Sequence, residues 1–72
     1  MADVYVEPRP KGRPTGTPIK DYAVEDRTHA VLYVTGTQQD AVDWAWANGH
    51  SPFVARVRRT DKANVLHWRS AR

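Results

Sequence analysis

The sequence predicts a small α+β fold, in which a three- or four-stranded, mainly antiparallel sheet carries one helix on one face. Several short runs alternate between polar residues and Val or Tyr, which is typical of strands, and one segment has the start and stop signals of a helix. The chain has 72 residues, which is room for one hydrophobic core. We therefore expect a single domain over residues 1–72, with elements in the order ββ-β-α-β.

Three strands are expected in the first half of the chain. The first covers residues 4–7, which alternate and end at a proline. Residues 8–18 hold four of the five prolines and two of the four glycines, so we expect an extended loop or arm there. Residues 19–26 and 30–34 are the next two strands, and the polar residues between them predict a hairpin turn.

The helix is expected between Thr37 and Gly49. The Thr37 side chain can cap the first free amides, and Asp40 three residues later resembles a capping box. Gly49 permits the left-handed conformation that ends many helices. Trp44 and Trp46 flank the apolar stripe of this helix, and Trp44 is expected to be the more buried. The stripe that should face the sheet consists of Ala41, Val42 and Ala45.

A last strand is expected over residues 52–59. Alternation places Arg56 and Arg58 on the side of the strand opposite to Phe53. Because one helix covers only one face of a small sheet, we predict that the arginine side is open to solvent. The tail, residues 60–72, is polar apart from a short apolar run that should dock on the body of the protein.

Composition excludes several classes of protein. The chain has no cysteine, which rules out disulfide scaffolds, cysteine zinc sites and thiol catalysis. No apolar run approaches the roughly 20 residues of a membrane helix, and the start lacks the features of a secretory signal. We therefore expect a cytoplasmic protein with no membrane partner.

The candidate nucleophiles and bases do not form a catalytic pattern. Ser51 and Ser70 lack the glycine-flanked elbow of a serine nucleophile, and Asp40 and Asp43 are expected on the solvent side of the helix. The three histidines are far apart in the sequence and lack the spacing of metal ligands. We expect no enzymatic activity, no metal, no cofactor and no small-molecule substrate.

Three short motifs stand out as a set. They are the strand that ends at Pro8, the strand segment Tyr22-Ala23-Val24, and Thr37-x-x-Asp40-Ala41-Val42 at the start of the helix. This set resembles a family of small bacterial proteins of unknown function, over about two-thirds of the chain. The resemblance implies a short antiparallel sheet with one helix, and it implies no chemistry. The chain departs from that family in the Pro/Gly-rich insertion after Pro8 and in Arg58-Arg59, where a glycine-marked turn is typical.

The charges are unevenly distributed along the chain. A net charge of +3 combines two basic ends with an acidic middle, and arginine outnumbers lysine. Guanidinium groups suit phosphates and base edges, so we predict nucleic-acid binding by a basic sheet face and the arm. The alternative is that these cations pair with the acidic middle of the same chain. The predicted contact residues are Lys11, Arg13, Arg56, Arg58, Arg59 and Lys62.

The arm contains Lys11-Gly12-Arg13-Pro14, which resembles the core of the AT-hook family. That resemblance implies an extended arm in the narrow minor groove of A·T-rich DNA. Here Thr15-Gly16-Thr17 follows, where AT-hooks carry further basic residues, so a plain loop is the competing interpretation.

The second hypothesis is a protein-interaction or self-associating domain. A chain of this size buries too little surface to be very stable alone, so association with a second copy would help the fold. An exposed Trp46, close in sequence to His50 in the loop after the helix, and an open sheet edge would form the partner surface. Both hypotheses describe a small non-enzymatic binding module, with nucleic acid slightly favoured as its ligand.

Overall fold

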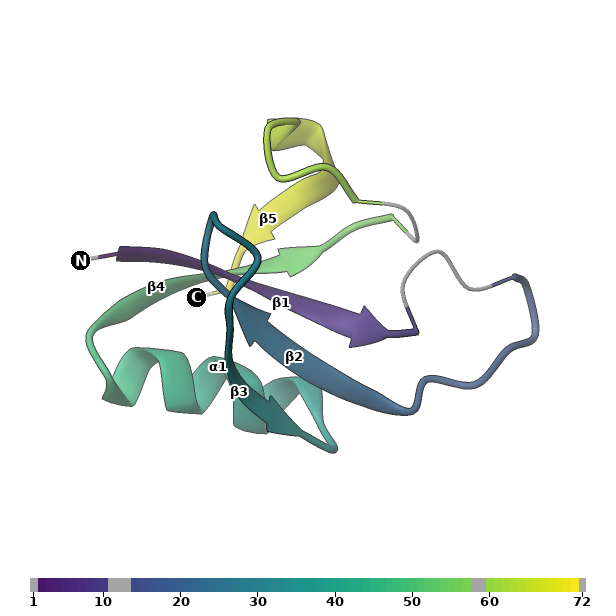
Figure 1. Ribbon diagram of the computed structural model, residues 1–72, viewed down its shortest axis with the longest axis horizontal. Coiled ribbons are helices and arrows are strands. Elements are labelled where there is room, and N and C mark those ends of the chain that lie inside the picture. The colour runs from purple at the N-terminus through teal and green to yellow at the C-terminus, as the bar shows by residue number, and fades with distance from the viewer. Residues whose placement is uncertain (1, 11–13, 58–59, 72) are drawn as a thin grey trace.

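The computed structural model describes residues 2–10, 14–57 and 60–71 and confirms the α+β fold, with one helix packed against a five-stranded sheet (Figure 1). The first three strands are β1 (Ala2–Arg9), β2 (Asp21–Glu25) and β3 (Val31–Thr35). Helix α1 (Gln38–Ala47) then leads to β4 (His50–Ala55). A short 3-10 helix, η1 (Val65–His67), precedes β5 (Trp68–Ser70).

The strands lie in the order β3-β2-β1-β4-β5, so β1 is central. The β1–β2, β2–β3 and β4–β5 pairs are antiparallel, whereas β1 and β4 are parallel. The mainly antiparallel sheet was predicted, but the parallel pair and the fifth strand were not. The parallel pair arises because α1 carries the chain across one face between β3 and β4, as a crossover helix does. The unexpected β5 has only three residues.

The ends of α1 are set by the local signals that the sequence predicted. Thr37 Oγ1 accepts a hydrogen bond from the backbone N–H of Asp40 at 3.1 Å, and Gly49 follows the helix with φ of 75°. Trp44 is half-buried and Trp46 is 39% exposed, which confirms the predicted difference between them. Among the described residues, no helix has the length and hydropathy needed to cross a membrane.

The hydrophobic core lies between α1 and one face of the sheet. Val54 of β4 is buried in it, whereas Phe53 and Ala55 face away from the helix. The predicted orientation of this strand is therefore wrong: the side that carries Val54 is the helix side, and Arg56 follows the last residue of β4. Both faces of β4 are covered, so the alternation of residue types does not identify the helix side. The buried cluster consists of Val4, Val6, Val24, Ala41, Ala45 and Val54.

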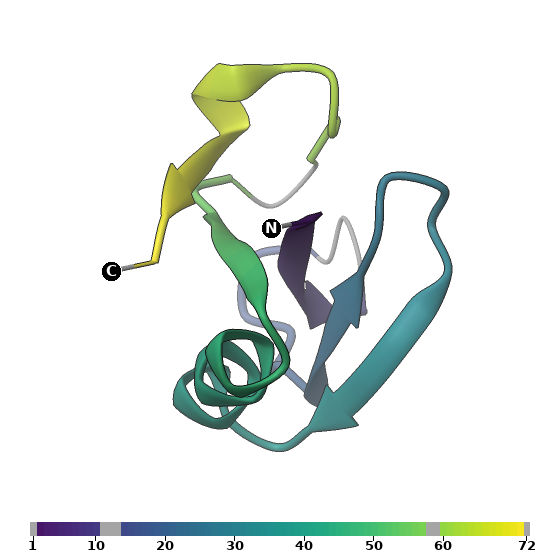
Figure 2. The same ribbon diagram turned by 90° about the vertical axis from the view of Figure 1, so that its left-hand side faces the viewer.

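The opposite face of the sheet was predicted to be open to solvent, but the C-terminal segment covers it. The chain from residue 60 to β5 runs over it, on the same side as the β2–β3 turn and away from α1 (Figure 2). Tyr5 of β1 packs against Trp68, with ring centroids 4.8 Å apart, and against Phe53 at 6.0 Å. The predicted docking of the apolar part of the tail is confirmed for Trp68, which is buried, but not for Val65 and Leu66, which are 80% and 74% exposed.

Candidate functional site

Two of the six predicted nucleic-acid contacts, Arg56 and Lys62, lie among the described residues, and their burial differs. Arg56 is exposed just after β4. Lys62, in contrast, has a side chain that is only 9% exposed. The remaining predicted contacts lie outside the described residues: Lys11, Arg13, Arg58 and Arg59.

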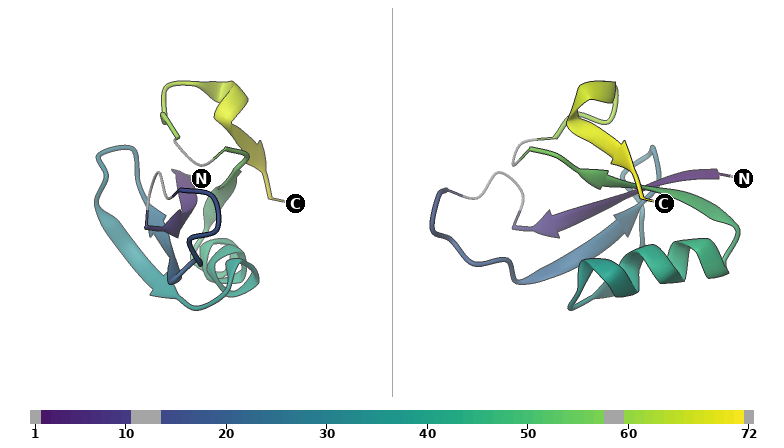
Figure 3. Two further views of the ribbon diagram at one scale, coloured as in Figure 1. Left: turned by 90° about the vertical axis from the view of Figure 1, so that its right-hand side faces the viewer. Right: turned by 180° about the vertical axis from the view of Figure 1, so that it is seen from behind.

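The arm between β1 and β2 is closed at its base by an ion pair. Arg9 and Asp21 are opposite each other in the β1–β2 ladder, and the Arg9 guanidinium donates to both carboxylate oxygens, at 2.5 and 2.7 Å. These hydrogen bonds hold the pKa of Asp21 below its usual value. The described part of the arm, residues 14–20, has neither helix nor strand and extends beyond the ends of the two strands (Figure 3).

Lys62 joins the C-terminal segment to the β2–β3 turn. Its Nζ atom donates to Glu25 Oε1 at 2.9 Å and to the backbone oxygen of Asp26 at 2.8 Å, and lies 2.9 Å from His29 Nδ1. The Glu25 side chain is 4% exposed, so this is a buried ion pair. The ammonium also lies 5.5 Å from the centre of the Tyr5 ring. The charge of Lys62 is therefore satisfied within the chain, which matches the alternative interpretation of the basic residues.

The β2–β3 turn is braced by the side chain of Asp26. Its Oδ1 atom accepts hydrogen bonds from the Thr28 backbone N–H at 2.8 Å, the Thr28 hydroxyl at 2.6 Å and the Ala30 backbone N–H at 3.1 Å. These bonds, the hydroxyl bond above all, lower the pKa of Asp26. His29 adopts the left-handed conformation that the turn requires, with φ of 70°. The exposed residue Arg27 is thereby held at a fixed place in the turn.

Two further contacts fix the C-terminal segment. The Thr60 hydroxyl donates to the buried carboxylate of Glu7 on β1. The Asp61 backbone N–H donates to His67 Nδ1 at 2.9 Å, and the Asp61 carbonyl accepts from the Trp68 indole N–H at 3.0 Å. The polar groups of this segment thus hold it against the sheet.

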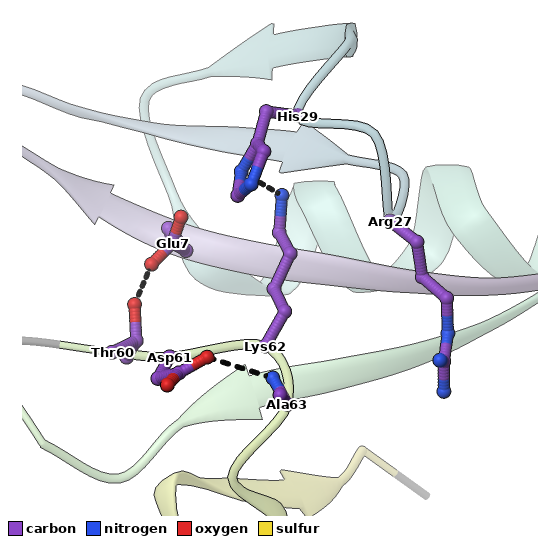
Figure 4. A pocket seen from close by; sticks show the side chains of 7 residues that line it. All are labelled: Glu7, Arg27, His29, Thr60, Asp61, Lys62 and Ala63. Carbon is purple, nitrogen blue, oxygen red and sulfur yellow. Dashed lines mark hydrogen bonds between the residues drawn. The ribbon is translucent and has the colours of Figure 1, made fainter.

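An open cleft of about 570 Å³ lies between the β2–β3 turn and the C-terminal segment (Figure 4). Lys62 spans it from the segment to His29, and Glu7 and Thr60 meet at one side. These contacts join the β2–β3 turn and β1 to the C-terminal segment, whereas Arg27, which also lines the cleft, is exposed. The described residues contain no group of three side chains able to hold a metal ion.

Trp46 and His50, the residues predicted for a protein-interaction surface, make different contacts within the chain: Trp46 contacts the C-terminal segment and His50 contacts Trp44. The Trp46 indole N–H donates to the carbonyl of Ala71 at 3.0 Å, which ties α1 to the end of β5. His50 stacks on Trp44 with ring centroids 5.7 Å apart. Its Nδ1 atom is buried and has no hydrogen-bond partner among the described residues. Trp46 is exposed as predicted, but it contacts the C-terminal segment, and His50 packs against another part of the helix.

Strand β3 forms one edge of the sheet and exposes a continuous apolar run. Val31, Leu32, Tyr33 and Val34 are between 37% and 51% exposed. Tyr33 stacks on Trp44 on the helix side, with ring centroids 4.9 Å apart, and Val34, opposite Ala23, faces the other side. The pairing with β2 is irregular at the Val31 end and regular toward Thr35. The sequence showed four consecutive apolar residues here, but not that the strand is an edge.

Comparison of the chain with known proteins identified no match. No family model, curated protein or solved structure matches it. The resemblances to the small bacterial family and to AT-hooks stay predictions.

Proposed function

We propose that this chain is a protein-interaction domain that pairs with a second copy of itself through the β3 edge. The observation that carries the proposal is the exposed apolar run on β3. An edge strand presents unpaired backbone N–H and C=O groups to solvent. When the side chains beside these groups are apolar as well, a partner strand gains both hydrogen bonds and apolar burial.

The β3 edge has little of the protection that keeps monomeric proteins apart. Natural edges are blocked by charged residues, especially lysine, by proline, or by a bulge. The residues of β3, Val31–Thr35, include no charged residue and no proline, and its irregularity is confined to the Val31 end. The other edge, β5, is only three residues long and carries Arg69. The two edges thus differ in the way expected if one of them is an interface.

Antiparallel pairing about a two-fold axis at Val34 suits the sequence of the strand. Val34 then meets Val34 of the second copy, on the face away from α1, and Tyr33 meets Thr35 on the helix side. Both are pairs of β-branched or aromatic residues, which stabilise antiparallel ladders. No like charges are brought together within the strand. The two five-stranded sheets would continue into one.

The predicted dimer is weak. The regular part of the edge is short, so the interface falls at the small end of specific protein contacts, and a Kd in the micromolar range or weaker is expected. Nucleic-acid binding remains a prediction, because among its described residues Lys62 is bonded within the chain and only Arg56 is left exposed. No observation favours it over edge pairing.

Sedimentation velocity at concentrations from about 10 μM to about 1 mM tests the proposal. The wild type should shift from monomer toward dimer, and Val34→Lys should stay monomeric because two ammonium groups would meet at the axis. Val65→Lys adds the same charge at a position that is 80% exposed on η1 and should dimerise like the wild type. Circular dichroism checks that both variants fold.

Either of two results would overturn the proposal. One is a wild type that remains monomeric at about 1 mM. The other is a folded Val34→Lys variant that associates as strongly as the wild type. Loss of association in Trp46→Ala, with Val34→Lys unaffected, would place the interface on the helix instead.

A further inference from the structure

A second, smaller cleft of about 200 Å³ lies on the sheet face away from α1. Its floor is formed by aromatic rings from three strands, Tyr5 of β1, Phe53 of β4 and Trp68 of β5, with Val65 of η1 at one side. Tyr5 and Trp68 are buried, and Phe53 is half-buried. This site is independent of the β3 edge.

Two opposite charges without partners stand beside this apolar floor. Arg27 and Asp3 both line the cleft and are exposed. Neither has a hydrogen-bond or ion-pair partner among the described residues of the protein. Lys62 lines the cleft too, but its ammonium is paired with Glu25 at 2.9 Å. The cleft therefore offers one cation and one anion to a ligand.

The backbone that carries the cation is held in place before any ligand binds. Arg27 belongs to the turn that is braced by Asp26 and tied to the C-terminal segment by Lys62. Its side chain extends away from that turn (Figure 4) and lines the cleft. A backbone fixed in this way loses less conformational entropy when its side chain binds.

The charges and the size select the class of ligand. A simple anion would be attracted by Arg27 and repelled by Asp3, and a simple cation would be attracted by Asp3 and repelled by Arg27. A zwitterion can pair with both residues. The aromatic floor requires an apolar group next to the charges. The cleft is smaller than the roughly 300 Å³ at which pockets for drug-sized ligands begin, so the ligand must be compact.

We propose that this cleft binds a free amino acid with an aromatic side chain. The carboxylate of the ligand pairs with the Arg27 guanidinium, its ammonium pairs with the Asp3 carboxylate, and its ring packs on Phe53 and Trp68. Because the site is open and its two charges are exposed, the expected Kd is in the millimolar range.

Titration with L-phenylalanine, followed by ¹H–¹⁵N NMR, tests the proposal. The chain has three tryptophans, and only Trp68 lines this cleft. Its indole N–H signal should move and saturate, whereas those of Trp44 and Trp46 on α1 should stay in place. N-acetyl-L-phenylalanine lacks the ammonium, L-phenylalaninamide lacks the carboxylate and glycine lacks the ring. Each should bind at least about fivefold more weakly than L-phenylalanine.

Four variants assign the contacts. Arg27→Gln and Asp3→Asn should each weaken L-phenylalanine binding by about fivefold. Arg27→Gln should not weaken the binding of L-phenylalaninamide, because that ligand has no carboxylate to pair with Arg27 and its positive charge is repelled by the guanidinium. The matched controls Arg56→Gln and Asp43→Asn remove the same charges from exposed positions outside the cleft and should bind like the wild type.

Three outcomes would overturn the proposal. The first is no movement of the Trp68 signal at about 20 mM L-phenylalanine, or equal movement of all three indole signals. The second is unchanged affinity in Arg27→Gln or in Asp3→Asn. The third is equal binding of N-acetyl-L-phenylalanine, which would show that the ammonium and Asp3 do not meet.

Discussion

Removal of the positive charge of Lys62 should strongly destabilise the fold. In Lys62→Met the side chain keeps its length and apolar stem, but the contacts of Nζ with Glu25, Asp26 and His29 are lost. The Glu25 carboxylate then stays in a poorly solvated position without this ammonium. Breaking a buried ion pair from one side costs about 3–5 kcal/mol. Because Glu25 has a further interaction, we expect a loss of about 2–3 kcal/mol.

Urea denaturation followed by circular dichroism measures this loss, at a protein concentration low enough to keep the chain monomeric. A loss of this size corresponds to a fall in Tm of about 10–20 °C for a domain of this length. Lys20→Met removes the same charge from an exposed position and should change stability by no more than about 0.5 kcal/mol. The double variant Glu25→Gln/Lys62→Met should lose less than the sum of the two single variants.

The difference in stability between Lys62→Met and Lys20→Met measures the contribution of the buried ion pair. If Lys62→Met is as stable as Lys20→Met, the ion pair does not hold the C-terminal segment on the sheet. The charge of Lys62 would then not stabilise the fold, and its ammonium would be available to a ligand.

Two other perturbations test local parts of the structure. The pKa of Asp26 is lowered by its hydrogen bonds, so its carboxylate stabilises the fold above the pKa of the unfolded chain, and this contribution is lost as the pH falls through the lower folded value. The Tm of the wild type should therefore fall more steeply below about pH 4 than that of Asp26→Asn; parallel profiles would contradict this. Gly49 has φ of 75° with open space around it, so Gly49→Ala should cost about 1 kcal/mol through backbone strain alone. A urea midpoint equal to that of the wild type would show that this residue is not held in the left-handed conformation.

The elements that the sequence predicted well are those whose signals are local. Thr37 and Gly49 define the ends of α1 because capping is chemistry between residues a few positions apart. The hairpin of β2 and β3 likewise joins neighbouring segments. β5 has only three residues, and the parallel β1–β4 pair joins segments that are distant in sequence. Neither leaves a local pattern.

The candidate sites depend almost entirely on contacts between distant residues. Lys62 and Glu25 are 37 positions apart, and nothing near either residue indicates the other. The sequence therefore left Lys62 open to two interpretations, and the structure supplies its partner. The sheet face was assigned incorrectly because Phe53 and Val54 are both apolar, and a second covering layer was not expected. The exposed edge at β3 also depends on distant contacts. The absence of charged residues in β3 is visible in the sequence, whereas its position at the edge follows from the strand order.

Chemical cross-linking tests the pairing of two β3 strands most directly. The chain has no cysteine, so Val34→Cys and Val65→Cys each provide one reactive thiol, and a short bismaleimide links thiols only where two copies bring them close. We expect covalent dimers of Val34→Cys, at the two-fold axis, to form many times faster than those of the more exposed Val65→Cys. Equal rates for the two variants would mean that the copies meet by random collision, and edge pairing would be wrong.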